Sequence, residues 1–478
     1  MYGPFDPAMV SPPNINPPLP MDEDCLTLNI AAPPAEPKQL LPVMVWFHGG
    51  GHSNGASSYY PIDALVNASG RGVVVVSLNY RLGVFGFLGS AELAARGGGS
   101  GTGNYGIEDQ RLALHWVQEH IAAFGGDPTK VTIFGESAGG LSVLTHLATP
   151  LSYQPALYHR AIIESGVYGG AKAMAKAEQT YAAVLNGTHC ADVACLLSTG
   201  ARDVAAAMPA VPVGPVIDGV ALAADPLAAI AAGEFNAKVP LIIGHNREEA
   251  AALMSAGIKT DASNFTEATF RQIGSQNFHL DDGMLDQLVV LYGEGHFELP
   301  KLRGNRSDWW WRSAAAYSDA GNLGHCPTRK IARSLANYSS AEVRAYIFEH
   351  PIQRDLTDAT FGWSEVRRGF NTPGNTVCLH TSEIVFALGD ELSVMPGEEA
   401  RLAAAVGLLW SRFATSGAPA SEWPPYQADE SDAFYVLDAE SAGGSRLEPG
   451  KEAKQCAFWE QLWARRGHSQ WATPLPPY

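Results

Sequence analysis

The chain has 478 residues, of which 46% are hydrophobic, and its formal net charge is −17. The apolar content suffices for a large buried core, whereas the acidic excess argues against a nucleic acid or an anionic membrane as partner. No run of 18 or more apolar residues occurs, so the sequence predicts a soluble globular protein without a transmembrane segment.

The predicted elements alternate between strands and helices. Apolar strand-like runs occupy residues 25–30, 42–47, 73–78, 131–134, 161–164, 240–244 and 343–348. The clearest helical periodicity covers residues 109–124, and further helical segments lie within 170–210 and 250–370. This alternation predicts an α/β fold with a mostly parallel central sheet flanked by helices on both faces.

The strand 131–134 ends in a pattern that suits a nucleophile, GESAGG at residues 135–140, and we expect a helix from Leu141. Glycines two residues to either side of Ser137 fit a sharp strand-to-helix turn, in which the apical residue has a positive φ and the flanking chain leaves no room for a Cβ. Such a turn exposes the serine hydroxyl at a helix N-terminus, where negative charge is stabilised.

A glycine-rich loop, His48-Gly49-Gly50-Gly51-His52, follows the strand 42–47. It is either a flexible turn or a loop whose backbone N–H groups stabilise an alkoxide that forms near Ser137. His48 and His52 are spaced like metal ligands on a helix, but the intervening glycines disfavour a helix, so we predict no metal site.

A serine attacks efficiently only when a base takes its proton, and an acid must orient that base. In this topology the acid and then the histidine follow the serine in the chain. The histidines late enough in the chain are His279, His296, His325, His350, His380 and His468. His380 is favoured because it precedes an apolar run at 384–388. Glu249 follows the strand 240–244 and is the favoured acid, with Asp218 and Glu248 as competitors.

Several longer motifs resemble the type-B carboxylesterase/lipase family, which includes fungal secreted esterases and lipases and the cholinesterases. The motifs are EDCLTLN at 23–29, HGGG at 48–51, NYRLGVFGFL at 79–88, the segment 103–128, GESAGG at 135–140 and HTSEIVF at 380–386. The resemblance implies an α/β-hydrolase fold that forms a single domain over residues 23–478, preceded by a proline-rich remnant at residues 1–22.

The same resemblance implies roles for individual residues. Its acid pattern falls on NREE at 246–249 and selects Glu249, and its histidine pattern selects His380 as the base for Ser137. The implied oxyanion-hole donors are the backbone N–H groups of Gly50, Gly51 and Ala138. Ser165 matches a serine that supports the acid in relatives. No metal or organic cofactor is implied.

The resemblance also sorts the cysteines. The implied disulfides join Cys190 to Cys195 and Cys326 to Cys456. Cys25 matches half of a third family bridge whose first cysteine lies upstream, where this sequence has none. Cys378 has no assigned partner, and we interpret it as a free buried thiol.

The sequence gives mixed signals about localisation. Five N-x-S/T sequons fit a glycosylated, secreted protein, although no signal peptide is visible. They lie at Asn67, Asn186, Asn264, Asn305 and Asn337. Relatives carry several dozen residues before EDCL, so we expect a secreted protein whose sequence is truncated at its N-terminus; the alternative is an intracellular variant.

Together these observations predict a serine carboxylic-ester hydrolase that cleaves small-molecule or lipid esters through an acyl-enzyme. Two alternatives stay open. A triacylglycerol lipase of the same family is disfavoured because the lid region of relatives would precede Cys25. A catalytically silent adhesion or binding homologue is disfavoured because such proteins usually lose the serine. The sequence predicts neither the acyl and alcohol groups nor the oligomeric state.

Overall fold

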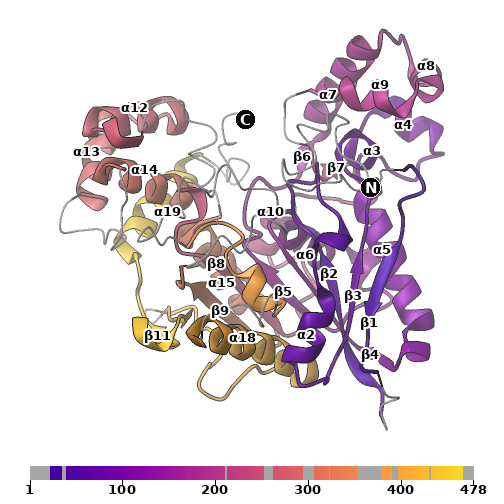
Figure 1. Cartoon of the computed structure of the whole chain (residues 1–478). Helices are drawn as coiled ribbons and strands as arrows, with labels where there is room; N and C mark the ends of the chain where they lie inside the picture. Colours follow the sequence, from indigo (N-terminus) through magenta and orange to yellow (C-terminus); the bar gives the residue numbers. More distant parts are fainter. Residues whose placement is uncertain are drawn as a thin grey trace.

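The computed structural model describes residues 22–34, 39–209, 213–251, 262–293, 306–321, 323–351, 378–389, 397–429 and 432–466. Within these residues lies a nine-stranded central sheet with the strand order β1-β3-β2-β4-β5-β8-β9-β10-β11 (Figure 1). The strands are β1 (Leu28–Ala31), β2 (Leu41–Phe47), β3 (Val74–Leu78), β4 (Gly126–Glu136), β5 (Arg160–Glu164), β8 (Leu241–Asn246), β9 (Val343–Phe348), β10 (Phe434–Leu437) and β11 (Arg446–Glu448).

Neighbouring strands from β3 to β10 run parallel. Only the edge strands β1 and β11 of this described sheet pair antiparallel to their neighbours. All five residues of β3 are buried, as expected for a strand covered on both faces. The predicted mostly parallel α/β architecture is therefore confirmed, and the parallel strands direct their carboxyl ends to one edge of the sheet.

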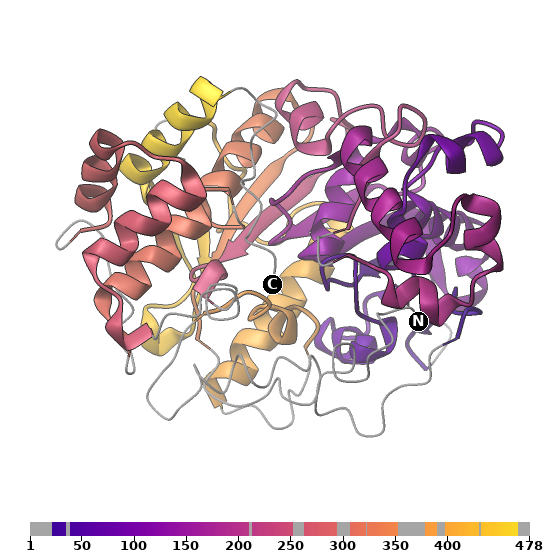
Figure 2. The same ribbon diagram turned by 90° about the horizontal axis from the view of Figure 1, so that it is seen from above.

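Successive side chains of β2 point to opposite faces of the sheet and enter two different cores. Val43, Val45 and Phe47 belong to the first core, and Met44 and Trp46 belong to the second. Helices cover both faces of the sheet, as the views from the front and from above show (Figures 1 and 2), and their buried side chains complete the two cores. The helices of the first core include α5 (Tyr105–His120), α6 (Ala138–Ala148), α10 (Pro226–Ala231) and α15 (His325–Tyr338), and those of the second include α2 (Ile62–Ala68), α17 (Ile384–Ala387) and α18 (Gly397–Ser416).

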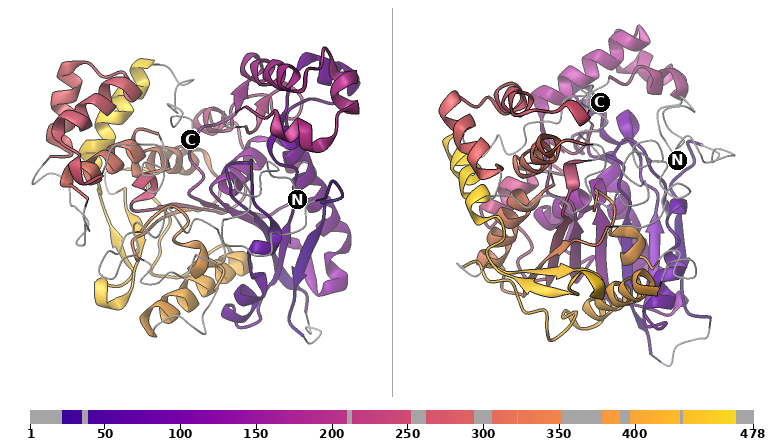
Figure 3. Two further views of the ribbon diagram at one scale, coloured as in Figure 1. Left: turned by 45° about the horizontal axis from the view of Figure 1, so that its top comes forward. Right: turned by 60° about the vertical axis from the view of Figure 1, so that its left-hand side comes forward.

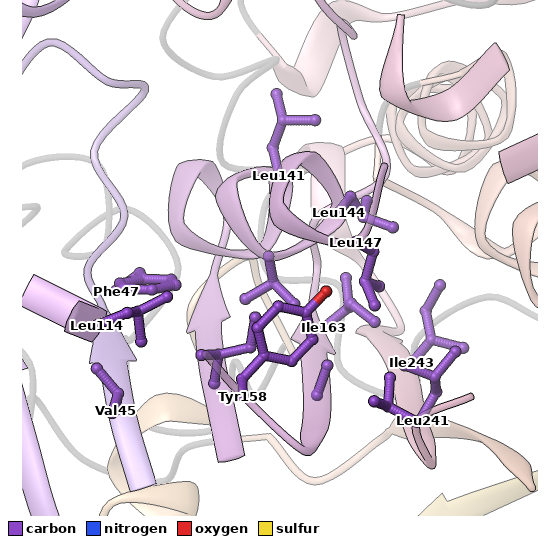
Figure 4. Packing of buried hydrophobic residues seen from close by; sticks show 14 of the residues in the cluster. Val45, Phe47, Leu114, Leu141, Leu144, Leu147, Tyr158, Ile163, Leu241 and Ile243 are labelled. Carbon is purple, nitrogen blue, oxygen red and sulfur yellow. The ribbon is translucent and has the colours of Figure 1, made fainter. Parts of the chain in front are cut away.

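Helix α6 is fixed on the sheet by its apolar face. Figure 4 shows Leu144 and Leu147 of this helix above Ile163 of β5 and above Leu241 and Ile243 of β8. Each of these five side chains is fully buried. The apolar burial holds the helix in register with β4, the strand that leads into it, and therefore holds the turn between them.

Two further groups of helices lie on opposite sides of the molecule (Figures 1 and 3). Trp310, Trp311 and Trp459 are buried in the core of the first group and so serve in packing. The first group comprises α12 (Glu267–Phe278), α13 (Asp282–Leu291), α14 (Asp308–Asp319) and α19 (Ala453–Arg466), and the second comprises α3 (Gly83–Phe87), α4 (Ala91–Arg96), α7 (Met174–Thr188), α8 (Val193–Ser198) and α9 (Ala201–Ala206). The short strands β6 (Lys172–Ala173) and β7 (Val216–Ile217) form a separate small sheet.

The structure contains two disulfides. Cys190 is bonded to Cys195, and Cys326 of α15 is bonded to Cys456 of α19, across 130 positions of sequence. Cys25 and Cys378 are buried free thiols. Within the part of the chain that the structure describes, no helix combines the length and apolarity needed to cross a membrane.

The predicted strands agree with the observed ones to within a few residues. Residues 1–21 and Asn305 lie outside the described residues, and the division into a remnant and a single domain stays a prediction. The expected start of the helix after Ser137 was wrong, since α6 begins at Ala138. A Cβ on Gly139 would lie 1.9 Å from the carbonyl oxygen of Phe47, so the first turn packs too closely on β2 for large apolar residues and lacks their periodic signal.

Candidate active site

Ser137 lies at the apex of the turn between β4 and α6, with the predicted positive φ, 56°. Its backbone N–H donates to the carbonyl oxygen of Glu164 over 2.9 Å. A Cβ on Gly135 would lie 2.5 Å from the carbonyl oxygen of Phe47, and one on Gly139 would lie still closer. Both flanking glycines are therefore required by the close approach of β2, and the serine is held in a conformation that few non-glycine residues adopt.

His380 and Glu249 are brought into contact from segments 131 residues apart. Nδ1 of His380 lies 2.6 Å from Oε2 of Glu249, and both side chains are buried. The other oxygen of Glu249, Oε1, accepts hydrogen bonds from the backbone N–H of Asn246 and from Oγ of Ser165, each over 2.6 Å. Three contacts thus fix the carboxylate of Glu249 and leave it oriented toward the imidazole.

The segment that begins at Cys378 and carries His380 is joined to Glu248, the neighbour of Glu249, by one backbone–backbone bond and one backbone–side-chain bond. The N–H of Glu248 donates to the carbonyl oxygen of Cys378 over 2.9 Å, and the N–H of Cys378 donates to Oε2 of Glu248 over 2.9 Å. Glu248 also pairs with Arg247. The side chain of Glu248 is consequently directed to the start of that segment rather than to the imidazole of His380.

The other candidates have different surroundings. Asp218 accepts from the backbone N–H groups of Thr102 and Leu222, each over 2.9 Å. His325 contacts His245 at 3.1 Å. His350 lies between Glu399 and Asp438, 3.4 Å from each, and His279 ends α12. His296 and His468 lie outside the described residues.

Three buried glutamates escaped the sequence interpretation: Glu136 and Glu383, whose charges act on His380, and Glu164, which pairs with Glu136 in the sheet. Oε1 of Glu136 lies 3.2 Å from Nε2 of His380, whereas Glu383 accepts from Asn246 and lies 3.1 Å from Oγ of Ser165. Glu136 and Glu164 are the last residues of β4 and β5. An acid that ends an apolar strand at the carboxyl edge of the sheet was the signal that could have identified these two.

The acidic surroundings shift the titration of the whole cluster. Burial, with the charge on Glu383, raises the pKa of Glu164 to about 8, and burial, with the charge on Glu249, raises the pKa of Glu383 to about 7. Burial also raises the pKa of Glu136 well above its usual value. For His380, burial lowers the pKa, but the carboxylates of Glu136 and Glu249 outweigh it and raise the pKa to about 9.

The glycine loop passes directly beside the serine. A Cβ on Gly49 would lie 2.8 Å from Oε2 of Glu136 and 3.1 Å from Cβ of Ser137. Gly50 and Gly51 follow with positive φ angles of 105° and 61°. Backbone N–H groups can approach a reacting oxygen closely here because no side chain intervenes.

The two histidines that bracket the glycine loop contact protein groups. Nδ1 of His48 lies 2.8 Å from the carbonyl oxygen of Gly49, and Nε2 of His52 lies 3.1 Å from Oγ of Ser142. Among the described residues, the structure shows no group of three or more His, Cys, Asp or Glu side chains suited to a metal ion.

A parallel sheet with a serine at a positive φ between a central strand and its helix defines an α/β-hydrolase. The family described as "Carboxylesterase family" matches residues 6–459. The chain is 31% identical to liver carboxylesterase B-1 of Rattus norvegicus, over 94% of this chain and 79% of that protein. It is 31% identical to acetylcholinesterase of Bungarus fasciatus, over 94% of this chain and 73% of that protein.

Among solved structures, the chain is similar to PNB esterase, with a TM-score of 0.71 and 29% identity over 93% of this chain and 86% of that one. The chain therefore belongs to the carboxylesterase family. Its fold is the α/β-hydrolase fold, and it is a carboxylic-ester hydrolase.

Proposed function

We propose that Ser137, His380 and Glu249 are the catalytic triad of this ester hydrolase. The observation that carries the proposal is the 2.6 Å contact between Nδ1 of His380 and Oε2 of Glu249. Glu249 accepts the Nδ1 proton, so the neutral imidazole leaves Nε2 unprotonated. A base in this tautomer can take the proton of a serine hydroxyl.

The reaction proceeds in two halves. Ser137 attacks the ester carbonyl while Nε2 of His380 takes its proton, and His380 then gives that proton to the leaving alcohol. Water attacks the resulting acyl-enzyme, again with His380 as the base, and the carboxylic acid is released. Each proton in this scheme is carried by the chain's own groups.

The backbone N–H groups of Gly50, Gly51 and Ala138 are proposed to bind the oxyanion in both halves of the reaction. Ala138 is the first residue of α6, so its N–H has no acceptor within the helix. Gly49 approaches Ser137 from β2, which brings the glycine loop to the same side of the turn. Donors fixed before the reaction stabilise the developing charge without reorganisation.

We infer that the protein is secreted or luminal and glycosylated. Two disulfides support an oxidising compartment. The sequon asparagines that the structure describes all have exposed side chains: Asn67, Asn186, Asn264 and Asn337. A mass decrease after treatment with an endoglycosidase, on protein made by a eukaryotic secretory host, tests this inference.

Intact-mass analysis after exposure to a serine-directed organophosphonate tests the triad. One adduct is expected on the wild type and on the control Ser421→Ala, which removes an exposed hydroxyl, but none on Ser137→Ala. Turnover of p-nitrophenyl butyrate is expected to disappear with the adduct. An adduct or undiminished turnover in Ser137→Ala would overturn the assignment. Comparison with p-nitrophenyl palmitate measures the preference between short and long acyl chains.

A further inference from the structure

The glycine loop is joined to the nucleophile helix by a side chain that the proposed reaction does not use. His52 follows Gly51 directly, is buried, and has a positive φ of 56°. Its ring packs against Phe87, with ring centroids 4.8 Å apart, and its Nε2 lies 3.1 Å from Oγ of Ser142 on α6. This hydrogen bond thus connects the glycine loop, which follows β2, to α6, which follows β4.

The proton positions in this connection follow from counting hydrogen bonds. Oγ of Ser142 donates its single proton to the carbonyl oxygen of Ala138 over 2.9 Å and accepts from Nε2 of Gln110 over 3.0 Å. A hydroxyl has one proton and two acceptor sites, so the remaining bond requires a donor. With the proton of Ser142 on the carbonyl oxygen of Ala138, the bond to Nε2 of His52 is satisfied by the tautomer that carries its proton on Nε2.

The hydrogen-bond network continues from Gln110 to His146 and Ser152, away from Ser137. Oε1 of Gln110 accepts from Nε2 of His146 over 3.0 Å, which leaves Nδ1 of His146 to accept from Oγ of Ser152 over 2.8 Å. Every donor named here meets an acceptor. A buried network satisfied in this way favours a single arrangement of its members.

Both imidazoles of the network are neutral at working pH. Burial, with the charge of Lys172, lowers the pKa of His52 to about 3, and burial, with the charge of Arg111, lowers the pKa of His146 to about 3. The neutral tautomers that the hydrogen bonds require are therefore the ones present, and the connection keeps its donors and acceptors across the range in which an esterase acts.

Backbone bonds hold the residues on either side of Gly51: the carbonyl oxygen of Gly50 accepts from the N–H of Ser53 over 3.0 Å, and that of His52 accepts from the N–H of Gly83 over 2.7 Å. A Cβ on Gly51 would meet nothing within 4 Å, so packing on that side of Gly51 does not help to fix its N–H. Gly50 and Gly51 are the residues whose N–H groups are proposed to bind the oxyanion. Donors of this kind must lie about 2.7–3.1 Å from the reacting oxygen, and a misplacement of about 1 Å is costly.

We propose that His52 is a positioning residue for the oxyanion hole. Its bond to Ser142 holds the donors of the glycine loop at a fixed distance from the donor of Ala138, because Ser142 is itself bonded to the carbonyl of Ala138. This inference rests on the proposed function, since it assumes that these N–H groups bind the oxyanion.

Three substitutions at one position separate the donor from the backbone and from packing. His52→Leu keeps a side chain of similar size that is not branched at Cβ, but it removes the hydrogen-bond donor. His52→Gln places an amide N–H at a reach similar to that of Nε2, whereas His52→Asn tolerates the positive φ but is too short to reach Ser142. The readouts are kcat and KM for p-nitrophenyl butyrate and inhibition by an aryl trifluoromethyl ketone, whose adduct places an oxyanion in the hole.

We expect kcat of His52→Leu and of His52→Asn to fall by about 10- to 100-fold, with KM changed less than about threefold. Affinity for the trifluoromethyl ketone falls by a similar factor, because the loss is specific to the oxyanion. His52→Gln restores kcat to within about threefold of the wild type. The ¹⁵N shifts of His52 in histidine-labelled protein, recorded independently of activity, show the tautomer with the proton on Nε2.

Four outcomes would overturn the inference: wild-type kcat and ketone affinity in His52→Leu, equal impairment of the Leu and Gln variants, a loss in KM rather than in kcat, or a proton on Nδ1 of His52. Ser137→Ala is measured in parallel. If that variant stays active, the proposed function fails and the inference falls with it, whereas an inactive Ser137→Ala beside a fully active His52→Leu contradicts only the role of His52.

Discussion

Glu136 contacts one ring nitrogen of His380, and Glu249 contacts the other. Oε1 of Glu136 lies 3.2 Å from Nε2, whereas Oε2 of Glu249 lies 2.6 Å from Nδ1. The ring therefore lies between two buried carboxyl groups. One of them, Glu136, directly precedes the proposed nucleophile, Ser137. An imidazolium formed during the reaction is stabilised from both sides.

Replacing Glu136 tests this relationship through the pH dependence of the rate. The base must be neutral to act, and the pKa of His380 is raised to about 9, so kcat/KM of the wild type is expected to rise with pH up to that region. Glu136→Gln removes one carboxylate and lowers the pKa of His380. We expect the rising limb to shift to lower pH by on the order of one unit, measured with p-nitrophenyl butyrate.

Glu234→Gln, which alters an exposed acid, serves as the control and should leave the rising limb of the pH profile in place. An unchanged limb in Glu136→Gln would show that Glu136 carries a proton throughout the measured range and does not set the pKa of the base.

Glu249→Gln tests the acid without changing its shape. An amide N–H facing Nδ1 favours the tautomer with the proton on Nε2, which cannot act as a base. We expect kcat to fall by about 10³- to 10⁴-fold. Glu248→Gln is the matched control, because Glu248 is directed to the N–H of Cys378, and we expect it to cost less than about tenfold. The opposite ranking in steady-state kinetics would assign the acid to Glu248.

Glu164→Gln tests the cost of a buried charge. One oxygen of Glu164 accepts from Nε1 of Trp410 over 2.7 Å, and the other has no hydrogen-bond partner among the described residues. The folded-state pKa of about 8 lies above the ordinary value of 4.5, so the folded protein retains a proton that the unfolded chain releases. The free energy of unfolding contributed by this group is present below about pH 4.5 and is lost as pH rises to about 8.

The variant should therefore match the wild type near pH 5 and exceed its stability near pH 9, by on the order of a few kcal/mol. Urea unfolding at both pH values measures this difference, with the exposed acid variant Glu234→Gln as the control. Equal stability of Glu164→Gln and the wild type at pH 9 would contradict a raised pKa for Glu164.

The two disulfides are expected to differ in their contribution to stability. Cys326 and Cys456 are 130 positions apart, whereas Cys190 and Cys195 are 5 apart. In the chain-entropy model the long loop contributes about 4–5 kcal/mol and the short loop about 2 kcal/mol. Denaturant unfolding of the two double serine variants compares them, and a larger loss from the short loop would contradict the entropic explanation.

The serine turn could be predicted from the sequence because its requirements are local. A positive φ at Ser137 and the close approach of Phe47 to Gly135 and Gly139 leave a signature within five consecutive residues. The alternating strands and helices were predictable for a similar reason, since each element carries its own apolar pattern.

Contacts between distant segments left no such pattern. Glu248 and Glu249 follow β8 equally closely, and only the family motif selected between them. The contact of Glu136 with His380 and the bond of His52 to Ser142 join segments 244 and 90 residues apart, as the residue numbers show. Both depend on how loops and helices pack at the sheet edge, which no periodicity within either segment encodes.

The bond between Cys326 and Cys456 also encloses the segment that carries His380. A single proteolytic cut anywhere between those two cysteines would leave both fragments covalently linked. Such a cleaved chain would migrate as one species on a non-reducing gel and as two after reduction, so an apparently intact band without reductant does not show that the polypeptide around the proposed base is uncut.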